Sequence, residues 1–335
     1  MQKVKLAKHL TWISALASLL LLSACGSQET PTASAAERPE VGVVLSDVGL
    51  GDQSYSDAAF RGLVKARDDQ GILFDYREID RAGSYDEAFK QLIEQDNDLI
   101  IGLGYMVKES LETAAKAHPD KQFLIVDDTS ELPNVASLTF KEEEGSYLAG
   151  VAAGLASKSG KVGFLGGVES DLLKKFQVGY EQGVKAANPA ASVKSVYAGD
   201  FGDSKLGSTI ASSMMQKDGI DVVYAAAGLT GVGALQEAER QGKYAIGVDT
   251  DQFFIAEKAV ITSMVKNVDN AIFTAVGTFN DNKGTFPQKD MVFGLKEEGV
   301  GIAPIRAVTL TPQQQAQIEE LTKSLISGEI AIQLP

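Results

Sequence analysis

Residues 41–69 read VGVVLSDVGLGDQSYSDAAFRGLVKARDD. The first five residues form a continuous apolar run, which is typical of a strand buried on both faces of a parallel sheet. From Ser54 to Asp69 the small and apolar residues instead recur at the i, i+3, i+4 spacing of an amphipathic helix. A buried strand followed by such a helix is part of a βαβ unit. The stretch therefore predicts an α/β protein with a doubly wound parallel sheet.

The same alternation recurs along the rest of the chain. In the first half, further strands are expected at residues 99–103 and 123–126, and helices at residues 85–95 and 107–117. The second half begins the pattern again, with strands at 161–165, 193–197, 222–226 and 245–248 and helices at 172–187, 204–216 and 232–240. About 300 residues follow Arg38, which is more than one hydrophobic core usually serves. Two similar lobes are therefore predicted.

The last part of the chain breaks the pattern. What remains is an apolar run at 260–265, a helix at 268–279, a strand at 291–295 and a final helix at 311–327. We expect these segments to return and complete the lobes, so that several chain crossings form the hinge. The predicted boundaries are residues 40–140 plus 253–288 for lobe 1 and residues 141–252 plus 289–330 for lobe 2.

Residues 1–24 have the features of a signal peptide. Three lysines precede an apolar run from Leu10 to Leu22, which is too short for an ordinary membrane-spanning helix. Small residues then lead into Cys25, the only cysteine of the chain, as in the cleavage site of bacterial lipoproteins. We predict that Cys25 becomes the acylated first residue, carrying chains such as palmitate, and that residues 25–39 form a flexible tether. An ordinary cleavage site with an incidental cysteine is the alternative.

The charge of the chain limits its partners. Removing residues 1–24, which hold three lysines and no acidic residue, changes the formal net charge from −14 to −17. A protein this acidic is a poor partner for nucleic acid or for an anionic membrane surface. No later segment has about 18 consecutive apolar residues. Attachment to the extracytoplasmic face of the cell membrane is therefore expected to come from the lipid alone.

The candidate binding site lies after the strands, because open α/β sheets bind ligands beyond the carboxyl ends of their strands. Carboxylates, glycines and one aromatic residue follow the predicted strands. Examples are Asp127, Phe201 and Asp249. Ionised carboxylates accept hydrogen bonds from hydroxyl groups, and such charge-assisted bonds are stronger than neutral ones. The pattern therefore indicates a ligand with several hydroxyl groups.

Six short motifs carry a resemblance to a known family. In chain order they are GDQSYSD (51–57), EGSYLAG (144–150), GFLGG (163–167), DVVYAAAG (221–228), GVDTDQ (247–252) and TSMVK (262–266). Each is weak alone, but together and in this order they span nearly all of the chain after the tether. On these motifs the sequence resembles the basic membrane protein family, lipoproteins that include the purine nucleoside receptors of ABC importers.

The resemblance implies a type I periplasmic-binding-protein fold that closes on a nucleoside and delivers it to ABC permease and ATPase subunits. By position, the implied ligand contacts are Ser56, Asp57, Asp127, Phe201, Gly228, Asp249 and Lys266. Phe201 would stack on the base, and Asp127 and Asp249 would hold the ribose hydroxyls. Gly228 would permit close approach of the backbone, and Lys266 would reach the closed cleft. Tyr55 and Ser56 differ from the usual Phe and Asn, which leaves the choice between purine and pyrimidine bases open.

Other interpretations of these residues remain. Asp57 could be a first-turn acid stabilised by the helix dipole, and Asp127 could cap a helix or a loop. Phe201 could belong to the core, and Lys266 could be a surface charge. The ligand could instead be a sugar or a signalling molecule, or the chain could be an adhesion or signalling lipoprotein without a transport role.

An enzyme is not expected. Only His9 and His118 are present, and His9 leaves with the signal peptide, so no histidine-based triad or metal cluster can form. No phosphate-binding GxxxxGK[ST] loop exists, and Gly231-Val232-Gly233 lacks the third glycine of a dinucleotide fingerprint. The sequence therefore predicts a monomeric binding protein without cofactor or metal.

Overall fold

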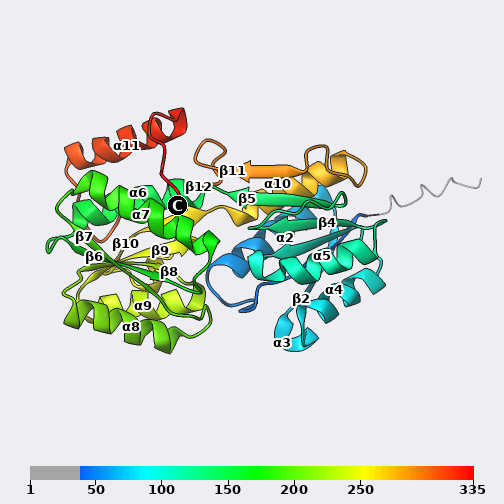
Figure 1. Ribbon diagram of the computed structural model, residues 1–335, viewed down its shortest axis with the longest axis horizontal. Helices are drawn as coiled ribbons and strands as arrows, with labels where there is room; N and C mark the ends of the chain where they lie inside the picture. The colour runs from blue at the N-terminus through cyan, green and yellow to red at the C-terminus, as the bar shows by residue number, and fades with distance from the viewer. Residues whose placement is uncertain (1–37) are drawn as a thin grey trace, which may run out of the picture. The chain divides into compact units, whose positions relative to one another are not determined.

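The computed structural model of the protein describes residues 38–335 (Figure 1). The predicted signal peptide, Cys25 and most of the predicted tether lie outside these residues. Residues 39–335 form one compact unit with two six-stranded sheets. Each sheet and the helices that cover it form one lobe.

The sheet of lobe 1 has the strand order β11-β5-β4-β3-β1-β2, with parallel pairing throughout. Its strands are β1 (Glu40–Val44), β2 (Leu73–Arg77), β3 (Leu99–Leu103), β4 (Gln122–Val126), β5 (Val135–Phe140) and β11 (Asp290–Phe293). All five residues of β3 are buried, as expected for the apolar sequence LIIGL in a strand covered on both faces. The order reverses between β1 and β3, which is the position where α/β sheets bind ligands.

The sheet of lobe 2 repeats this design, with the order β12-β10-β9-β8-β6-β7. Its strands are β6 (Lys161–Gly166), β7 (Ser192–Tyr197), β8 (Val222–Ala226), β9 (Tyr244–Asp249), β10 (Val260–Lys266) and β12 (Val300–Ile302). Among the described strands, only the edge strand β12 pairs antiparallel, with β10. The prediction of two doubly wound lobes is thus confirmed.

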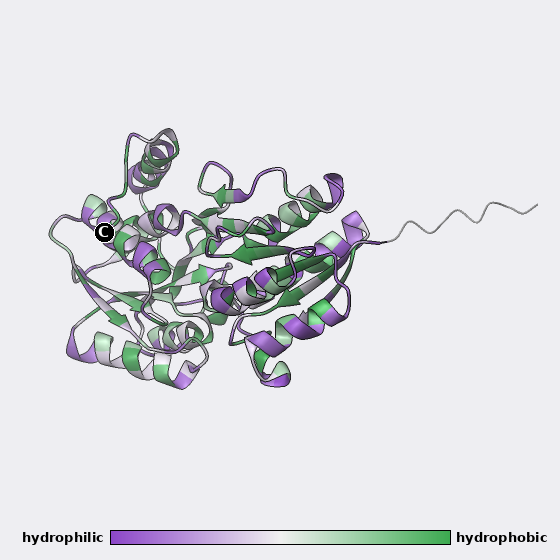
Figure 2. Cartoon of the chain, turned by 45° about the vertical axis from the view of Figure 1, so that its right-hand side comes forward, coloured by the Kyte–Doolittle hydropathy of each residue, from purple (hydrophilic) through white to green (hydrophobic). Residues whose placement is uncertain are grey.

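Amphipathic helices cover both sheets. They are α2 (Tyr55–Gln70), α3 (Ile79–Ala82), α4 (Tyr85–Glu94), α5 (Lys108–Ala117), α6 (Glu142–Ala156), α7 (Asp171–Ala187), α8 (Ser204–Lys217), α9 (Gly228–Arg240), α10 (Val268–Asp281) and α11 (Pro312–Ser327). Two short 3₁₀ turns, η1 (Tyr105–Val107) and η2 (Phe253–Ile255), follow β3 and β9. Figure 2 shows hydrophobic residues gathered on the strands and hydrophilic residues on the outer surfaces of the helices. The core of each lobe therefore lies between its sheet and its helices.

Helix α6 differs from the others because most of its residues are buried. It packs against α7, and glycines allow the two backbones to meet. A Cβ atom on Gly183 would lie 1.9 Å from the Tyr147 carbonyl oxygen, and one on Gly150 would lie 2.1 Å from the Tyr180 carbonyl oxygen. Neither position can hold a larger residue without separating the helices.

The strands near the end of the chain change the predicted lobe boundaries. We expected β10 in lobe 1 and β11 in lobe 2, but β10 pairs with β9 in the sheet of lobe 2. Strand β11 instead lies beside β5 in lobe 1 (Figure 1). An apolar run shows that a strand is buried but does not say in which sheet. Helix α10 packs on α2 in lobe 1, so the chain changes lobes between β5 and α6, between β10 and α10, and between β11 and β12.

Candidate functional site

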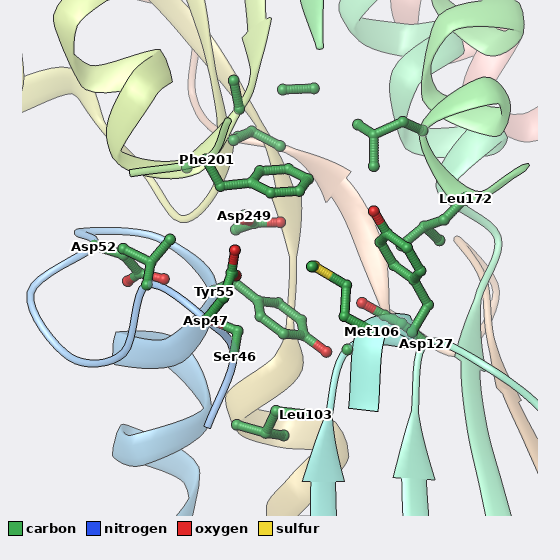
Figure 3. A pocket seen from close by; sticks show the side chains of 18 of the residues that line it. Ser46, Asp47, Asp52, Tyr55, Leu103, Met106, Asp127, Leu172, Phe201 and Asp249 are labelled. Carbon is green, nitrogen blue, oxygen red and sulfur yellow. The ribbon is translucent and has the colours of Figure 1, made fainter. Parts of the chain in front are cut away.

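A pocket lies where the carboxyl ends of the two sheets meet (Figure 3). It holds about 700 Å³ of empty space including its open mouth, within the usual range for small-molecule sites. Residues at or after the ends of β1, β3 and β4 line it from lobe 1, together with Tyr55 and Tyr85 from helices. From lobe 2 it is lined by residues at or after the ends of β7, β8, β9 and β10 and by three apolar residues of α7, Leu172, Leu173 and Phe176. The pocket therefore occupies the strand-end position predicted from the sequence.

A buried lysine joins the lobes at the back of this pocket. Lys266, the last residue of β10, is 2% exposed, and its Nζ lies 2.7 Å from the Asp127 carboxylate and 3.1 Å from Glu142 Oε1. Burial alone would lower the pKa of Lys266, but the negative charges of Asp127, Glu142 and Asp249 raise it above its usual value. Lys266 is therefore charged, and one cation faces three buried carboxylates.

Burial raises the pKa values of two carboxylates in this cluster. Burial raises the pKa of Asp249 to about 6, although the charge of Lys266 and the hydroxyl of Ser54 oppose the rise. Burial also raises the pKa of Glu142, again against the charge of Lys266. The three carboxylates therefore carry more negative charge than the buried Lys266 neutralises, and the cluster favours ligand groups that donate hydrogen bonds.

Asp127 and Asp249 occupy matching places in the two lobes, directly after β4 and at the end of β9. Both have positive φ angles, 70° and 61°, in the left-handed region that residues other than glycine seldom adopt. Such backbone conformations persist where the surrounding structure imposes them, and they are common at binding sites. Each turn places a carboxylate in the wall of the pocket.

Two aromatic side chains from opposite lobes point into the pocket, Tyr55 from α2 and Phe201 from the loop after β7 (Figure 3). Glycines fix the Phe201 ring in place. A Cβ atom on Gly167 would lie 2.2 Å from Phe201 Cε1, and one on Gly228 would lie 3.2 Å from the Phe201 carbonyl oxygen. Gly228 also has a φ of 53°, which suits glycine. The absence of a side chain at Gly167 therefore lets the Phe201 ring lie close against the backbone at this position.

Three tyrosine hydroxyls in the wall of the pocket make no well-formed hydrogen bond among the described residues. They belong to Tyr55, Tyr85 and Tyr105, and each oxygen is buried. Burial, followed by the charge of Asp47, raises the pKa of Tyr85, so its hydroxyl stays protonated and can donate. The hydroxyls of Tyr55 and Tyr105 do interact with neighbouring polar side chains, Asp127 and Ser170. Buried polar groups are almost always hydrogen-bonded, so a bound molecule is the natural partner of the Tyr85 hydroxyl.

The chain matches the family model described as ABC transporter substrate-binding protein PnrA-like, over residues 40–334. The chain belongs to this Bmp family. Among its relatives are the CD4+ T-cell-stimulating antigen of Listeria monocytogenes, with 34% identity and 95% coverage of each chain, and basic membrane protein A of Borreliella burgdorferi, with 33% identity and 95% and 93% coverage. The ABC transporter nucleoside-binding protein BmpA of Lactococcus lactis shares 31% identity, with 95% and 96% coverage. The resemblance to the basic membrane proteins is thus confirmed.

Solved structures agree with this membership of the Bmp family. An ABC transporter solute-binding protein of Aeropyrum pernix superposes with a TM-score of 0.80 at 27% identity and covers 89% of this chain and 94% of its own. A transcriptional activator of the comK gene from Bacillus halodurans superposes with a TM-score of 0.74 at 23% identity, which shows a shared fold. The predicted type I periplasmic-binding-protein fold is confirmed. The Bmp family is one of substrate-binding proteins rather than enzymes, and it implies an extracytoplasmic place.

Five of the predicted contacts lie in the pocket wall of this Bmp protein. They are Asp127, Phe201, Gly228, Asp249 and Lys266. The structure does not bring Ser56 and Asp57 there. Ser56 is buried, and its Oγ lies 2.7 Å from Ser46 Oγ.

Asp57 serves its own loop instead of the pocket. Its two carboxylate oxygens accept hydrogen bonds from the backbone N–H groups of Gly51 (2.9 Å) and Gln53 (3.0 Å). A first-turn acid that accepts such bonds stabilises the entry to a helix. Ser46, Asp47 and Tyr55 line this side of the pocket in its place.

The sequence interpretation missed several pocket residues, among them Tyr85, Tyr105 and the apolar residues Leu172 and Phe176 of α7. Tyr105 comes two residues after the end of β3, so a strict search beyond every strand end would have included it. Tyr85 opens α4 and does not follow a strand, so no sequence signal singles it out. Within residues 38–335, no helix is long and apolar enough to cross a membrane, and no His, Cys, Asp and Glu side chains gather as a metal site.

Proposed function

We propose that the protein is a lipid-anchored, monomeric receptor that captures nucleosides, with purine nucleosides preferred, and delivers them to the permease and ATPase of an ABC importer. One observation carries the proposal. The same pocket combines an aromatic ring from each lobe with two buried carboxylates and a charged lysine. A nucleoside offers a flat base for an aromatic ring and vicinal hydroxyls for the carboxylates.

The proposed contacts divide the pocket into two ends. Asp127, Asp249 and Lys266 form a charged end, where ionised carboxylates would accept hydrogen bonds from the ribose hydroxyls. Phe201 would stack on the base, since bases stack readily on aromatic rings. The Tyr55 ring, whose centroid lies 5.3 Å from Lys266 Nζ, would contact the ligand beside the charged end. The Lactococcus lactis relative, whose name describes nucleoside binding, supports this ligand class.

We propose that the protein is attached to the membrane through acyl chains on Cys25. No helix of the described part could span a bilayer, and the acidic chain does not favour an anionic membrane surface. An acyl chain contributes about 0.8 kcal/mol for each buried methylene, so more than one chain on Cys25 would hold the protein stably.

A ligand panel tests the function. Thermal shift and calorimetric titration of the protein with purine nucleosides, pyrimidine nucleosides, free bases and sugars should show a response to nucleosides above all. A ligand at one hundred times its dissociation constant adds about 2.7 kcal/mol to the free energy of unfolding. Mass spectrometry of small molecules that co-purify with the protein would identify the class of ligand without a prior choice of candidates. A response to sugars with none to any nucleoside would replace the proposal by the sugar-binding alternative.

A further inference from the structure

Three hydrogen bonds connect the lobes beside the pocket, and one of them involves the pocket residue Asp249. Ser54 Oγ donates to Asp249 Oδ2 at 2.5 Å. Gln252 Nε2 and Thr250 Oγ1 both donate to the carbonyl oxygen of Gln53, at 3.1 Å and 3.3 Å. Gln53 and Ser54 precede α2 in lobe 1, whereas Asp249 ends β9 in lobe 2 and Thr250 and Gln252 lie in the turn that follows it. We call the contacts of these five residues the latch.

Ser54 has an unusual role for its position. It is the N-cap residue of α2, where a serine side chain normally accepts a hydrogen bond from its own helix, but here it makes no such bond. Asp52 takes over this task and accepts bonds from the N–H groups of Ser54 (2.9 Å), Ser56 (2.8 Å) and Asp57 (3.2 Å). The Ser54 hydroxyl is therefore free to reach across to the other lobe.

Gln252 is fixed within lobe 2 before it touches lobe 1. Its side chain is buried, its Oε1 accepts from the N–H of Val248 at 2.9 Å, and its own N–H donates to Ser263 Oγ at 3.0 Å. These bonds leave Nε2 aimed at Gln53. On the two sides of the latch, Gln53 (φ 53°) and Asp249 (φ 61°) both have left-handed backbone. Strained residues facing each other across a binding site suggest a functional constraint.

We propose that Ser54 is a positioning residue for Asp249 and that the latch sets the rate at which bound ligand leaves. The carboxylate that lines the pocket is the same one that holds the lobes together, so opening breaks the Ser54 bond as it exposes the ligand. The part of this proposal that concerns release rests on the proposed nucleoside function. The part that concerns lobe closure does not.

The size of the effect follows from the bonds. A hydrogen bond to a charged group is worth more than a neutral one, so Ser54→Ala should raise the dissociation rate of a nucleoside about tenfold. Thr250→Val removes a longer, exposed hydrogen bond between neutral groups and should raise the dissociation rate about threefold. The association rate should change by less than about twofold, because related complexes differ mainly in dissociation. The affinity ratio of guanosine to adenosine should not change, since the latch donors do not line the base end.

Stopped-flow measurement with guanosine and adenosine tests the release rate. Ser137→Ala is the matched control, because Ser137 is a buried serine of lobe 1 whose Oγ accepts from the N–H of Ser130 within the same lobe. It should lose stability without faster release. Thr250→Val keeps the test valid if Ser54→Ala folds poorly, because Thr250 is partly exposed. Unchanged dissociation rates in both latch variants would overturn the proposal.

A second measurement needs no ligand. Spin labels on Lys90→Cys in α4 and Lys217→Cys in α8, in a chain with Cys25→Ser, report the distance between lobes. Ser54→Ala should shift the ligand-free distances toward longer values, and Ser137→Ala should not. If the distances shift but no nucleoside binds, the latch stands and the nucleoside proposal fails. If nucleosides bind and the distances do not shift, the latch is wrong.

Discussion

Replacement of Lys266 by methionine tests the charge balance of the pocket. Methionine fills similar space without a charge, so Asp127 and Asp249 would remain buried without a cation beside them, and Glu142 would keep only the more exposed Lys175. Removal of one partner from a buried ion pair typically costs about 3–5 kcal/mol. We expect Lys266→Met to lower the free energy of unfolding by this amount at pH 7, or to prevent folding.

The loss of unfolding free energy caused by Lys266→Met should be smaller at acidic pH than at pH 7. The pKa of Asp249 is raised to about 6 in the folded protein and that of Glu142 is raised as well, so the folded state binds these protons more tightly than the unfolded state. Such groups add stability as the pH falls through their folded pKa values and lose it as the pH rises. Without Lys266 both pKa values rise further. At pH 5 the difference between Lys266→Met and the wild type should fall to about half its value at pH 7.

Urea denaturation of both proteins at pH 7 and pH 5 measures these differences. Lys175→Met is the control, because Lys175 Nζ lies 3.4 Å from Glu142 Oε2 but its side chain is 34% exposed. Exposed pairs contribute about 0–1 kcal/mol, so this variant should stay close to the wild type. A loss below 1 kcal/mol for Lys266→Met, equal at the two pH values, would refute the reasoning about the buried charges.

Further expected outcomes concern the ligand and the anchor. Asp249→Ala should cost about 2–4 kcal/mol of nucleoside affinity in calorimetry and erase the preference for a nucleoside over its free base. Phe201→Ala should cost about 1–3 kcal/mol and keep that preference. Gly167→Ala should displace the Phe201 ring and weaken binding at least threefold, whereas Gly301→Ala, where a Cβ atom meets nothing within 4 Å, should not. Cys25→Ala should move the protein from the membrane to the soluble fraction, and its retention at high salt would contradict the anchor.

The sequence predicted the two lobes and most of their buried strands, but it missed β5 (VASLTF), an inner strand whose serine and threonine interrupt the apolar run. Strands β3 and β4 are apolar along their length because both faces are covered, and such runs are easy to find. Strand β2 (LFDYR) was missed because it lies at the edge of its sheet, half-exposed, and keeps polar residues. Strand β12 has only three residues, too few for any periodicity. The exchange of β10 and β11 between lobes depends on pairing partners, which hydrophobicity does not encode.

For the site, strand-end position was the useful signal. Asp127, Phe201 and Asp249 were found because sheet topology brings strand ends together whatever lies between them in sequence. Asp57 was misplaced because a carboxylate in the first turn of a helix can face a ligand or bind its own loop. Here the carboxylate of Asp57 binds its own loop, because the backbone N–H groups of Gly51 and Gln53 donate hydrogen bonds to it. That orientation follows from the backbone of the loop and has no signature in residue types.

The interleaving of the lobes has a consequence for export. Strand β5 is complete early, but its neighbour β11 lies more than a hundred residues later in the chain. While the polypeptide emerges from a translocation channel, the β5 side of the first sheet stays an open edge, and open edges recruit other strands. Neither half of the protein is a contiguous segment that could be produced alone. Until residue 293 has emerged, β5 therefore lacks the strand that covers this edge in the finished sheet.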